Sequence, residues 1–175
     1  NQPDREIPSD LPRIDFFHWV LVDLPPTLTQ IAEGEFSRGF TPRGKPGPAA
    51  LHGARQGAND YTAWFAGDAQ MAGKYFGYDG PFPPFNDSLV HHYVFTLYAV
   101  SVARLPVEVD FNGNDVRAPL AGISFAAAPS SGIYTPRYSL SLLSALPTLS
   151  ASSRRTARRA ISIFRQRIMT PRVSL

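Results

Sequence analysis

The chain of 175 residues contains no cysteine and no long apolar run. Without cysteine the protein can form no disulfide bond and has no thiolate to act as a nucleophile or a metal ligand. No apolar stretch approaches the length of about 18 residues that a membrane-spanning helix needs, so no transmembrane segment is predicted. Hydrophobic residues make up 43% and aromatic residues 12% of the chain, which is typical of a single globular domain.

Acidic residues are absent from residue 116 onward. Residues 1–115 hold all 14 acidic and 8 of the 17 basic residues, a net charge of −6. Residues 116–175 hold the other 9 basic residues, all arginine, and carry +9. A basic chain often binds nucleic acid or anionic membranes, but here the positive charge belongs to one end. We therefore expect no nucleic-acid partner, and membrane contact only through the basic tail, if at all.

Motifs of several enzyme classes are also missing from the sequence. It contains no Gly-x-Ser-x-Gly nucleophile elbow, no His-Glu-x-x-His metal motif and no Walker-type phosphate loop. Catalysis by a histidine would also require a nucleophile or a metal, and a third group to orient the base. The sequence predicts that the protein is not an enzyme and needs no cofactor or metal.

Two segments have the alternating, β-branched and aromatic pattern of strands. The first, residues 15–24 (DFFHWVLVDL), is apolar on both faces, which predicts a central strand covered on both sides. Strict alternation places His18 on the same face as Val20. The second runs over residues 91–102, and we expect the two strands to be neighbours in a central sheet.

In the second strand, alternation places His91 and Tyr93 on one face and His92 on the other. An imidazole and a phenol therefore lie side by side at the start of a largely apolar strand. They follow a loop, residues 78–84, that three prolines stiffen by fixing φ. We expect the chemistry of the protein at this point, whereas an adjacent His91–His92 metal pair is disfavoured by the geometry.

The remaining segments give weaker signals. Residues 27–60 are rich in glycine and proline and predict a long connection. Residues 61–77 fit a short helix or a loop, and residues 105–109 fit a weak or edge strand. A short helix is expected to start at Val116, and Pro119 allows it little length.

Three motifs together resemble the phosphatidylethanolamine-binding protein family, most closely its bacterial branch, often labelled Raf-kinase-inhibitor-like. They are FFHWVLVDLP in residues 16–25, the Tyr-x-Gly-Pro-x-Pro-Pro loop in residues 78–84, and His-x-Tyr-x-Phe-x-Leu-Tyr in residues 91–98. Gln56-Gly57-x-Asn59-Asp60-Tyr61 fits as well, and the likeness spans about residues 10–122. The resemblance implies a mostly-β, sandwich-like fold with a central sheet, long loops and few short helices.

The ends of the chain depart from the family pattern. The family's first strands and an Asp-Pro-Asp motif that supplies a pocket carboxylate have no sound equivalent here, so we expect an exposed sheet edge and an incomplete pocket. Residues 123–175 look divergent or frame-shifted. We therefore predict a family-like domain over residues 1–140 and a basic, disordered or non-native tail over 141–175. An amphipathic helix with Ile161, Phe164 and Ile168 on its apolar face is the alternative for this tail.

The resemblance implies a small pocket for a phosphate-bearing ligand. Carried over by position, its ligand-binding residues are His18, His91 and Tyr93, and its wall is formed by Gly80, Pro81 and Pro84. Imidazoles, a phenol and the N–H groups of a Gly/Pro loop can all donate hydrogen bonds to an oxyanion.

Other interpretations stay open for the individual residues. His18 alone could be a hydrogen-bonded core histidine. His92 reads as structural or exposed, and His52 as a solvated loop residue. Asp60 could shape the loop near the pocket or stabilise a turn, while Trp19 and Trp64 fit a core better than a ligand platform.

The favoured function is thus a module that binds a small anion or a phosphorylated head group. The alternative is a regulatory protein that inhibits a kinase or a protease through the surface around the pocket. The sequence does not decide between a cytoplasmic and a periplasmic location.

Overall fold

The described part of the chain consists mainly of antiparallel strands. The structure is a computed structural model, and it describes residues 14–39, 41–83, 87, 91–134 and 159–168. Its strands are β1 (Phe16–Leu24), β2 (Arg55–Gly57), β3 (His91–Val100), β4 (Ser124–Tyr134) and β5 (Arg159–Ile168). Within the described residues they form a sheet in the order β2-β1-β5-β3-β4, and every pairing is antiparallel. The predicted mostly-β class is confirmed.

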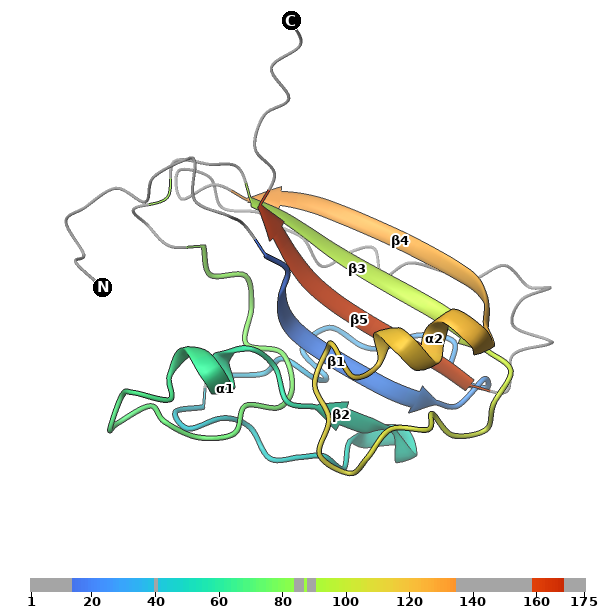
Figure 1. Cartoon of the computed structure of the whole chain (residues 1–175), viewed down its shortest axis with the longest axis horizontal. Coiled ribbons are helices and arrows are strands. Elements are labelled where there is room, and N and C mark those ends of the chain that lie inside the picture. Colours follow the sequence, from blue (N-terminus) through green and yellow to red (C-terminus); the bar gives the residue numbers. More distant parts are fainter. Residues whose placement is uncertain (1–13, 40, 84–86, 88–90, 135–158, 169–175) are drawn as a thin grey trace, which may run out of the picture.

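The two predicted strands are present as β1 and β3, but they are not neighbours. β5 lies between them, and its Ile163 is opposite Val20 of β1 on one side and Thr96 of β3 on the other. Because both pair antiparallel to β5, β1 and β3 start at the same end of the sheet (Figure 1). The predicted adjacency was wrong because alternation along a strand fixes its faces and not its neighbours.

Strand β5 comes from the segment that the sequence assigned to the basic tail. Residues 159–168 are paired on both sides, so a disordered tail and an amphipathic helix are both wrong for this stretch. Three isoleucines and a phenylalanine in ten residues favour a strand, and pairing on both sides satisfies the backbone N–H and C=O groups. The remainder of the tail lies outside the described residues, and whether the tail is native stays a prediction.

Short helices connect the strands. A 3₁₀ turn spans Leu51–Gly53, α1 is a single turn at Tyr61–Trp64, and α2 spans Arg117–Ile123. Pro119 is the third residue of α2, where the N–H that proline lacks has no partner inside the helix in any case. The weak strand expected at residues 105–109 does not form, since this stretch has no strand assignment.

Apolar side chains cover both faces of β1, as predicted for a central strand. On the face that α2 covers in Figure 1, a buried cluster contains Phe17, Val20, Val22, Val100, Leu105, Phe111, Val116 and Leu120. On the opposite face, a second cluster contains Trp19, Leu21, Leu24, Ala54, Tyr78, Tyr93 and Phe95, against which Phe36 and other side chains of the long connection pack. The histidines of the predicted site belong to this second face.

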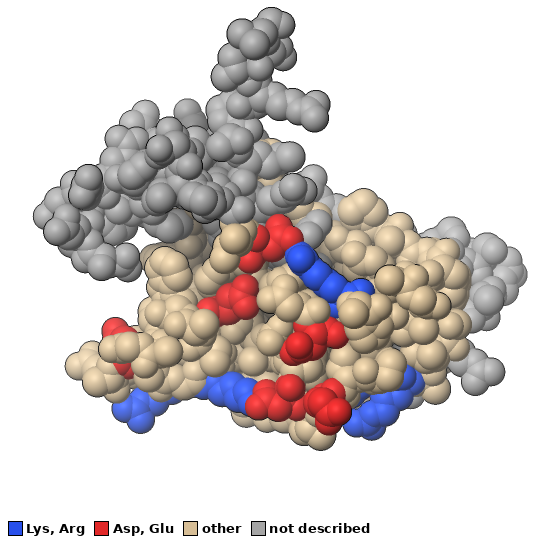
Figure 2. Space-filling view, in the orientation of Figure 1, with Lys and Arg blue, Asp and Glu red and all other residues tan. Residues whose placement is uncertain are grey.

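The surface around α2 carries charges of both signs. Figure 2 shows acidic side chains across the middle of this face with basic side chains beside them. Arg117 pairs with Asp15, and Lys74 pairs with Asp110. No helix in the described ranges is long and apolar enough to cross a membrane.

Candidate functional site

His18 and Tyr93 meet on one face of the sheet although β5 separates their strands. The ring centroids of the two side chains are 5.5 Å apart. Both residues are buried, with exposed fractions of 1% for His18 and 0% for Tyr93. The structure therefore brings together an imidazole and a phenol that are 75 residues apart in the sequence, and both groups can donate a hydrogen bond to an oxyanion.

A bulge in β1 turns His18 towards this face. The register of β1 against β5 shifts between Phe17 and Trp19. Phe17 and Val20 pack in the cluster on the α2 face. On the opposite face, the His18 ring contacts Tyr93, and Trp19 belongs to the same buried cluster as Tyr93. The predicted sharing of a face by His18 and Val20 was therefore wrong, because the extra residue of a bulge reverses the alternation.

His91 lies two residues before Tyr93 on the same strand. Both side chains are fully buried and His92 between them is half-buried, so the alternation predicted for β3 is confirmed. This places His91 on the face of Tyr93. It leaves His92 on the other side, away from the cluster.

Asp87 is a site residue that sequence reasoning missed. Its Oδ2 lies 3.3 Å from Nε2 of His91, and both side chains are completely buried. At this distance the two groups form an ion pair whenever the imidazole is protonated. Asp87 and His91 are four residues apart, a spacing that predicts a side-chain contact when both residues belong to one helix. No helix was predicted over residues 87–91, so the sequence contained no signal for this pair.

Aromatic rings surround His18 on its other sides. The His18 ring centroid lies 4.8 Å from that of Phe16 and 5.5 Å from that of Tyr61, the first residue of α1. Burial raises the pKa of Tyr61 far above its ordinary value, so its phenol keeps its proton and remains a hydrogen-bond donor. Trp64 at the end of α1 is 55% exposed, and its prediction as a core residue was wrong.

The loop predicted as the pocket wall is attached to this face by Tyr78. The Tyr78 ring lies 6.0 Å from Phe95 and 6.3 Å from Trp19. Lys45 forms an ion pair with Asp79 and donates a hydrogen bond of 3.3 Å to the Tyr78 carbonyl oxygen. Burial lowers the pKa of Lys45.

The predicted wall residues themselves are only partly described. Gly80 has φ +96°, a left-handed conformation that residues with a side chain rarely adopt, which explains a glycine after Asp79. Gly80 and Pro81 are half-buried. Pro84 lies outside the described residues. The ligand-binding role of all six predicted residues stays a prediction.

Asp60 holds the bulged part of β1 in place. Its Oδ2 accepts a hydrogen bond of 2.7 Å from the N–H of Phe17, and its own N–H donates to the Phe17 carbonyl oxygen at 2.9 Å. Burial raises the pKa of Asp60, while the Phe17 hydrogen bond and the charge of Arg117 act in the opposite direction. The Asp60 carboxylate thus holds the backbone of β1 next to His18.

Two substitutions of Asp60 should separate its hydrogen bond from its charge. Asp60→Ala removes the acceptor for Phe17 and should cost about 1–2 kcal/mol of unfolding free energy. Asp60→Asn keeps an acceptor oxygen and should cost much less at about pH 7. Because the folded-state pKa is raised, the wild type gains stability as the pH falls towards that pKa, and the Asn variant should lack this gain. Urea unfolding at about pH 7 and about pH 5 measures both effects; equal losses in the two variants would contradict this role.

His52 has a partner that the sequence did not indicate. Its Nε2 lies 2.6 Å from Oε1 of Glu35. The residue is nevertheless exposed, as predicted for a solvated loop residue. The pKa of Glu35 is lowered, first by the hydrogen bond from the Ala32 N–H and then by His52. This pair lies in the long connection and involves none of the predicted site residues.

Comparison with known proteins settles the family. The family model described as phosphatidylethanolamine-binding protein matches residues 2–135. The chain belongs to this family. The matched range contains β1 to β4 and every predicted site residue of the phosphatidylethanolamine-binding domain, whereas β5 lies outside it.

Curated relatives agree with this assignment. A UPF0098 protein of Aquifex aeolicus is 30% identical over 125 residues, which cover 71% of this chain and 60% of that protein. The UPF0098 protein YbcL of Escherichia coli is 28% identical over 119 residues, covering 68% of this chain and 54% of YbcL. A UPF0098 protein of Methanothermobacter thermautotrophicus is 30% identical over 125 residues, covering 71% and 66%. The chain thus spans between about half and two thirds of the length of these relatives. No solved structure matches it.

Proposed function

We propose that this member of the phosphatidylethanolamine-binding protein family binds a phosphate-bearing small molecule or lipid head group at the cluster of His18, His91 and Tyr93. The observation that carries the proposal is the contact between His18 and Tyr93 across β5, with ring centroids 5.5 Å apart. His91 adds a second imidazole on the same face, two residues from Tyr93. Three hydrogen-bond donors thus come from two strands that are not adjacent.

The chemistry of these groups suits a phosphate better than a neutral ligand. Each phosphate oxygen accepts several hydrogen bonds, and protonated imidazoles also supply positive charge. Apolar side chains of the second cluster surround the donors and lower the local dielectric, which strengthens hydrogen bonds to a charged ligand. A phenol at Tyr93 can donate without carrying a charge that would repel the anion.

Access to the cluster requires a rearrangement, because the three side chains are at most 1% exposed. The Asp87 carboxylate lies beside the His91 imidazole, with its Oδ2 3.3 Å from Nε2. We propose that a phosphate oxygen takes the position of this carboxylate when the ligand binds. Asp87 would then compete with the ligand for His91.

Binding of inorganic phosphate to four variants tests this arrangement. Removing one hydrogen bond to a charged ligand costs about 1.5–3 kcal/mol, so His91→Gln and Tyr93→Phe should each weaken binding by about tenfold or more. Asp87→Asn removes a competing negative charge and should tighten binding by roughly tenfold. Isothermal titration calorimetry measures the dissociation constants.

His92→Gln is the matched control, since His92 is the neighbour of His91 on the opposite side of the strand. It should leave phosphate affinity unchanged. Equal losses for His91→Gln and His92→Gln, or no phosphate binding by the wild type, would refute the proposal. Phosphoethanolamine in a parallel titration separates a head group from free phosphate, because only a head-group site gains affinity from the amine.

The resemblance also implies regulation of a kinase or a protease. No feature of the described surface favours that role over simple ligand binding, and a direct test is a pulldown against both classes of protein.

A further inference from the structure

The three aromatic rings that contact His18 differ in how much solvent reaches them. Tyr61 and Tyr93 are buried, whereas Phe16 is only half-buried, although its ring centroid lies 4.8 Å from that of His18. Of these three rings, Phe16 is therefore the one past which solvent comes nearest to the imidazole. A ligand that reaches His18 from outside needs the smallest rearrangement on this side.

Trp64 lies next to Phe16 on the same side. The two ring centroids are 6.2 Å apart, with the ring planes at 79°, and Trp64 is 55% exposed. A single exposed tryptophan on a protein surface needs no explanation, but this one borders the least covered side of His18. We call Phe16 and Trp64 together the aromatic rim.

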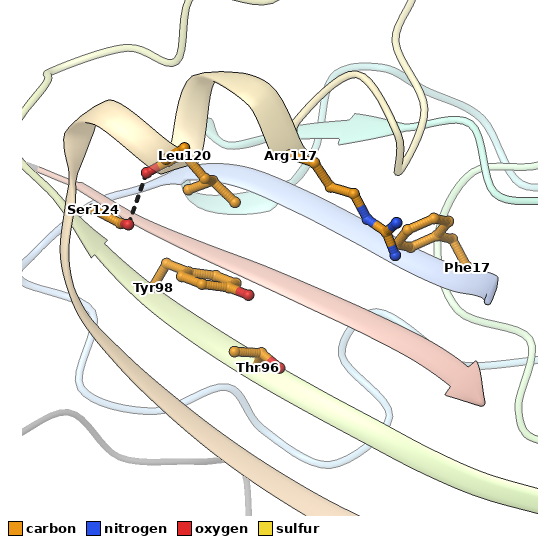
Figure 3. Close-up of a pocket in the computed structure, with 7 residues that line it drawn as sticks. Phe17, Thr96, Tyr98, Arg117, Leu120 and Ser124 are labelled. Atoms are coloured by element: carbon orange, nitrogen blue, oxygen red, sulfur yellow. Dashed lines mark hydrogen bonds between the residues drawn. The ribbon is translucent and has the colours of Figure 1, made fainter. Parts of the chain in front are cut away.

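The aromatic rim belongs to the histidine face of the sheet. Phe17, the residue between Phe16 and His18, points to the α2 face instead, where the Arg117 guanidinium lies 4.9 Å from its ring centroid (Figure 3). A molecule bound at the rim is thus within reach of His18 and remote from the pocket beneath α2.

Hydrogen bonds fix the helix that carries Trp64. Asn59 Oδ1 accepts a hydrogen bond of 3.1 Å from the Tyr61 N–H, and Asn59 Nδ2 donates one of 3.1 Å to the Gly77 carbonyl oxygen. Thr62 Oγ1, inside α1, accepts a hydrogen bond of 3.0 Å from the N–H of Tyr75. Because this backbone is already ordered, a ligand that packs against it pays little additional entropy.

The neighbours of the rim add no unpaired charge. Helix α1 contains no charged residue. Of the two carboxylates beside the rim, Asp15 forms an ion pair and Asp60 accepts a backbone hydrogen bond. The residue of β5 that pairs with Phe16 is Gln166, which is uncharged. These neighbours leave aromatic surface as the feature that a ligand can use at the rim.

We propose that the aromatic rim selects among phosphate esters and favours those that carry an aromatic ring. The phosphate lies at His18, His91 and Tyr93, and the ring of the ester packs on the Trp64 indole with its edge towards Phe16. Aromatic pairs of this kind gain more than their buried area alone provides. The inference rests on the phosphate site proposed above and makes Trp64 its specificity-determining residue.

Three phosphate esters test the selection in calorimetric titrations of the full chain. Phenyl phosphate should bind about threefold to tenfold more tightly than methyl phosphate, in line with the strength of an aromatic pair. Cyclohexyl phosphate has a ring of similar size without π electrons and should bind less tightly than phenyl phosphate. In NMR spectra, the Trp64 indole N–H resonance should shift saturably with phenyl phosphate and much less with methyl phosphate.

Substitutions at Trp64 locate the ring of the ester. Trp64→Ala should bring the affinity for phenyl phosphate down to that for methyl phosphate, and Trp64→Phe should keep part of the preference. Phe125→Ala is the matched control, because Phe125 is also an exposed aromatic residue, 44% exposed. It follows Ser124, which pairs with Val100 at the end of β3, whereas His91 begins that strand. This variant should keep the full preference for phenyl phosphate.

Failure of this inference and failure of the phosphate site give different results. The inference is overturned if methyl phosphate binds and phenyl phosphate gains nothing, if cyclohexyl phosphate binds as tightly as phenyl phosphate, or if the preference survives Trp64→Ala. The phosphate site then still stands, because the affinity for methyl phosphate measures it alone. If neither inorganic phosphate nor methyl phosphate binds, both proposals are overturned.

Discussion

Replacing Asp23 by alanine is expected to reduce the unfolding free energy by about 3–5 kcal/mol, which is the usual cost of removing one partner of a buried ion pair. Asp23 Oδ2 lies 2.6 Å from Nε of Arg55, and its Oδ1 accepts a hydrogen bond of 2.7 Å from the Leu105 N–H. Both charged residues are buried. Without the carboxylate, the guanidinium would stay in the core beside the Phe111 ring and the carbonyl oxygens of Leu105 and Val107, with its charge uncompensated by a described acidic group.

Companion variants separate the charge of Asp23 from its backbone conformation. Asp23 has φ +63°, which asparagine tolerates far better than alanine. Asp23→Asn should therefore lose mainly the ion pair. Combining Asp23→Ala with Arg55→Met removes both charges and should recover part of the loss. A cost below about 1 kcal/mol for Asp23→Ala in urea unfolding would show that the pair does not hold β1 and β2 together.

Gly73→Ala is the second substitution with a large expected effect. A Cβ at this position would overlap the backbone carbonyl oxygen of Arg43, which no side-chain rotation can relieve. The loops around residues 43 and 73 touch here, and the Arg43 N–H donates a hydrogen bond of 3.1 Å to the Tyr75 hydroxyl. Separating them should cost about 3 kcal/mol, measured by chemical unfolding.

Gly67→Ala is the matched control for this change. Both glycines have ordinary φ values, but a Cβ at Gly67 would meet nothing within 4 Å. The Gly67 variant should stay within about 0.5 kcal/mol of the wild type. Similar stabilities of the two variants would mean that the loops around residues 43 and 73 are not held in contact.

The strands that carry the site could be predicted because their side chains alternate. The aromatic and β-branched residues of residues 16–24 and 91–100 indicated both strands, and the alternation of His91, His92 and Tyr93 is confirmed. The bulge next to His18 could not be predicted in this way. A bulge depends on how β1 pairs with β5, and pairing partners are not encoded in the pattern of one strand.

Contacts between distant or irregular segments were the part that the sequence did not reveal. β5 was overlooked because its arginines resembled a basic tail, although its isoleucines fit a strand. Asp87 stands in a stretch with no predicted helix, so its contact with His91 had no periodic signal. A pocket beneath α2 is likewise lined by described side chains from β1, β3, α2 and the start of β4, which lie far apart in the sequence (Figure 3).

The central claim is that His18 and His91 bind one anion together. Long-range ¹H–¹⁵N NMR of the four histidines during titration with phosphoethanolamine tests it most directly. The account predicts that the imidazole resonances of His18 and His91 shift with a single dissociation constant, while those of His92 and His52 stay in place. Shifts confined to His92 or His52, or unequal dissociation constants for His18 and His91, would contradict it.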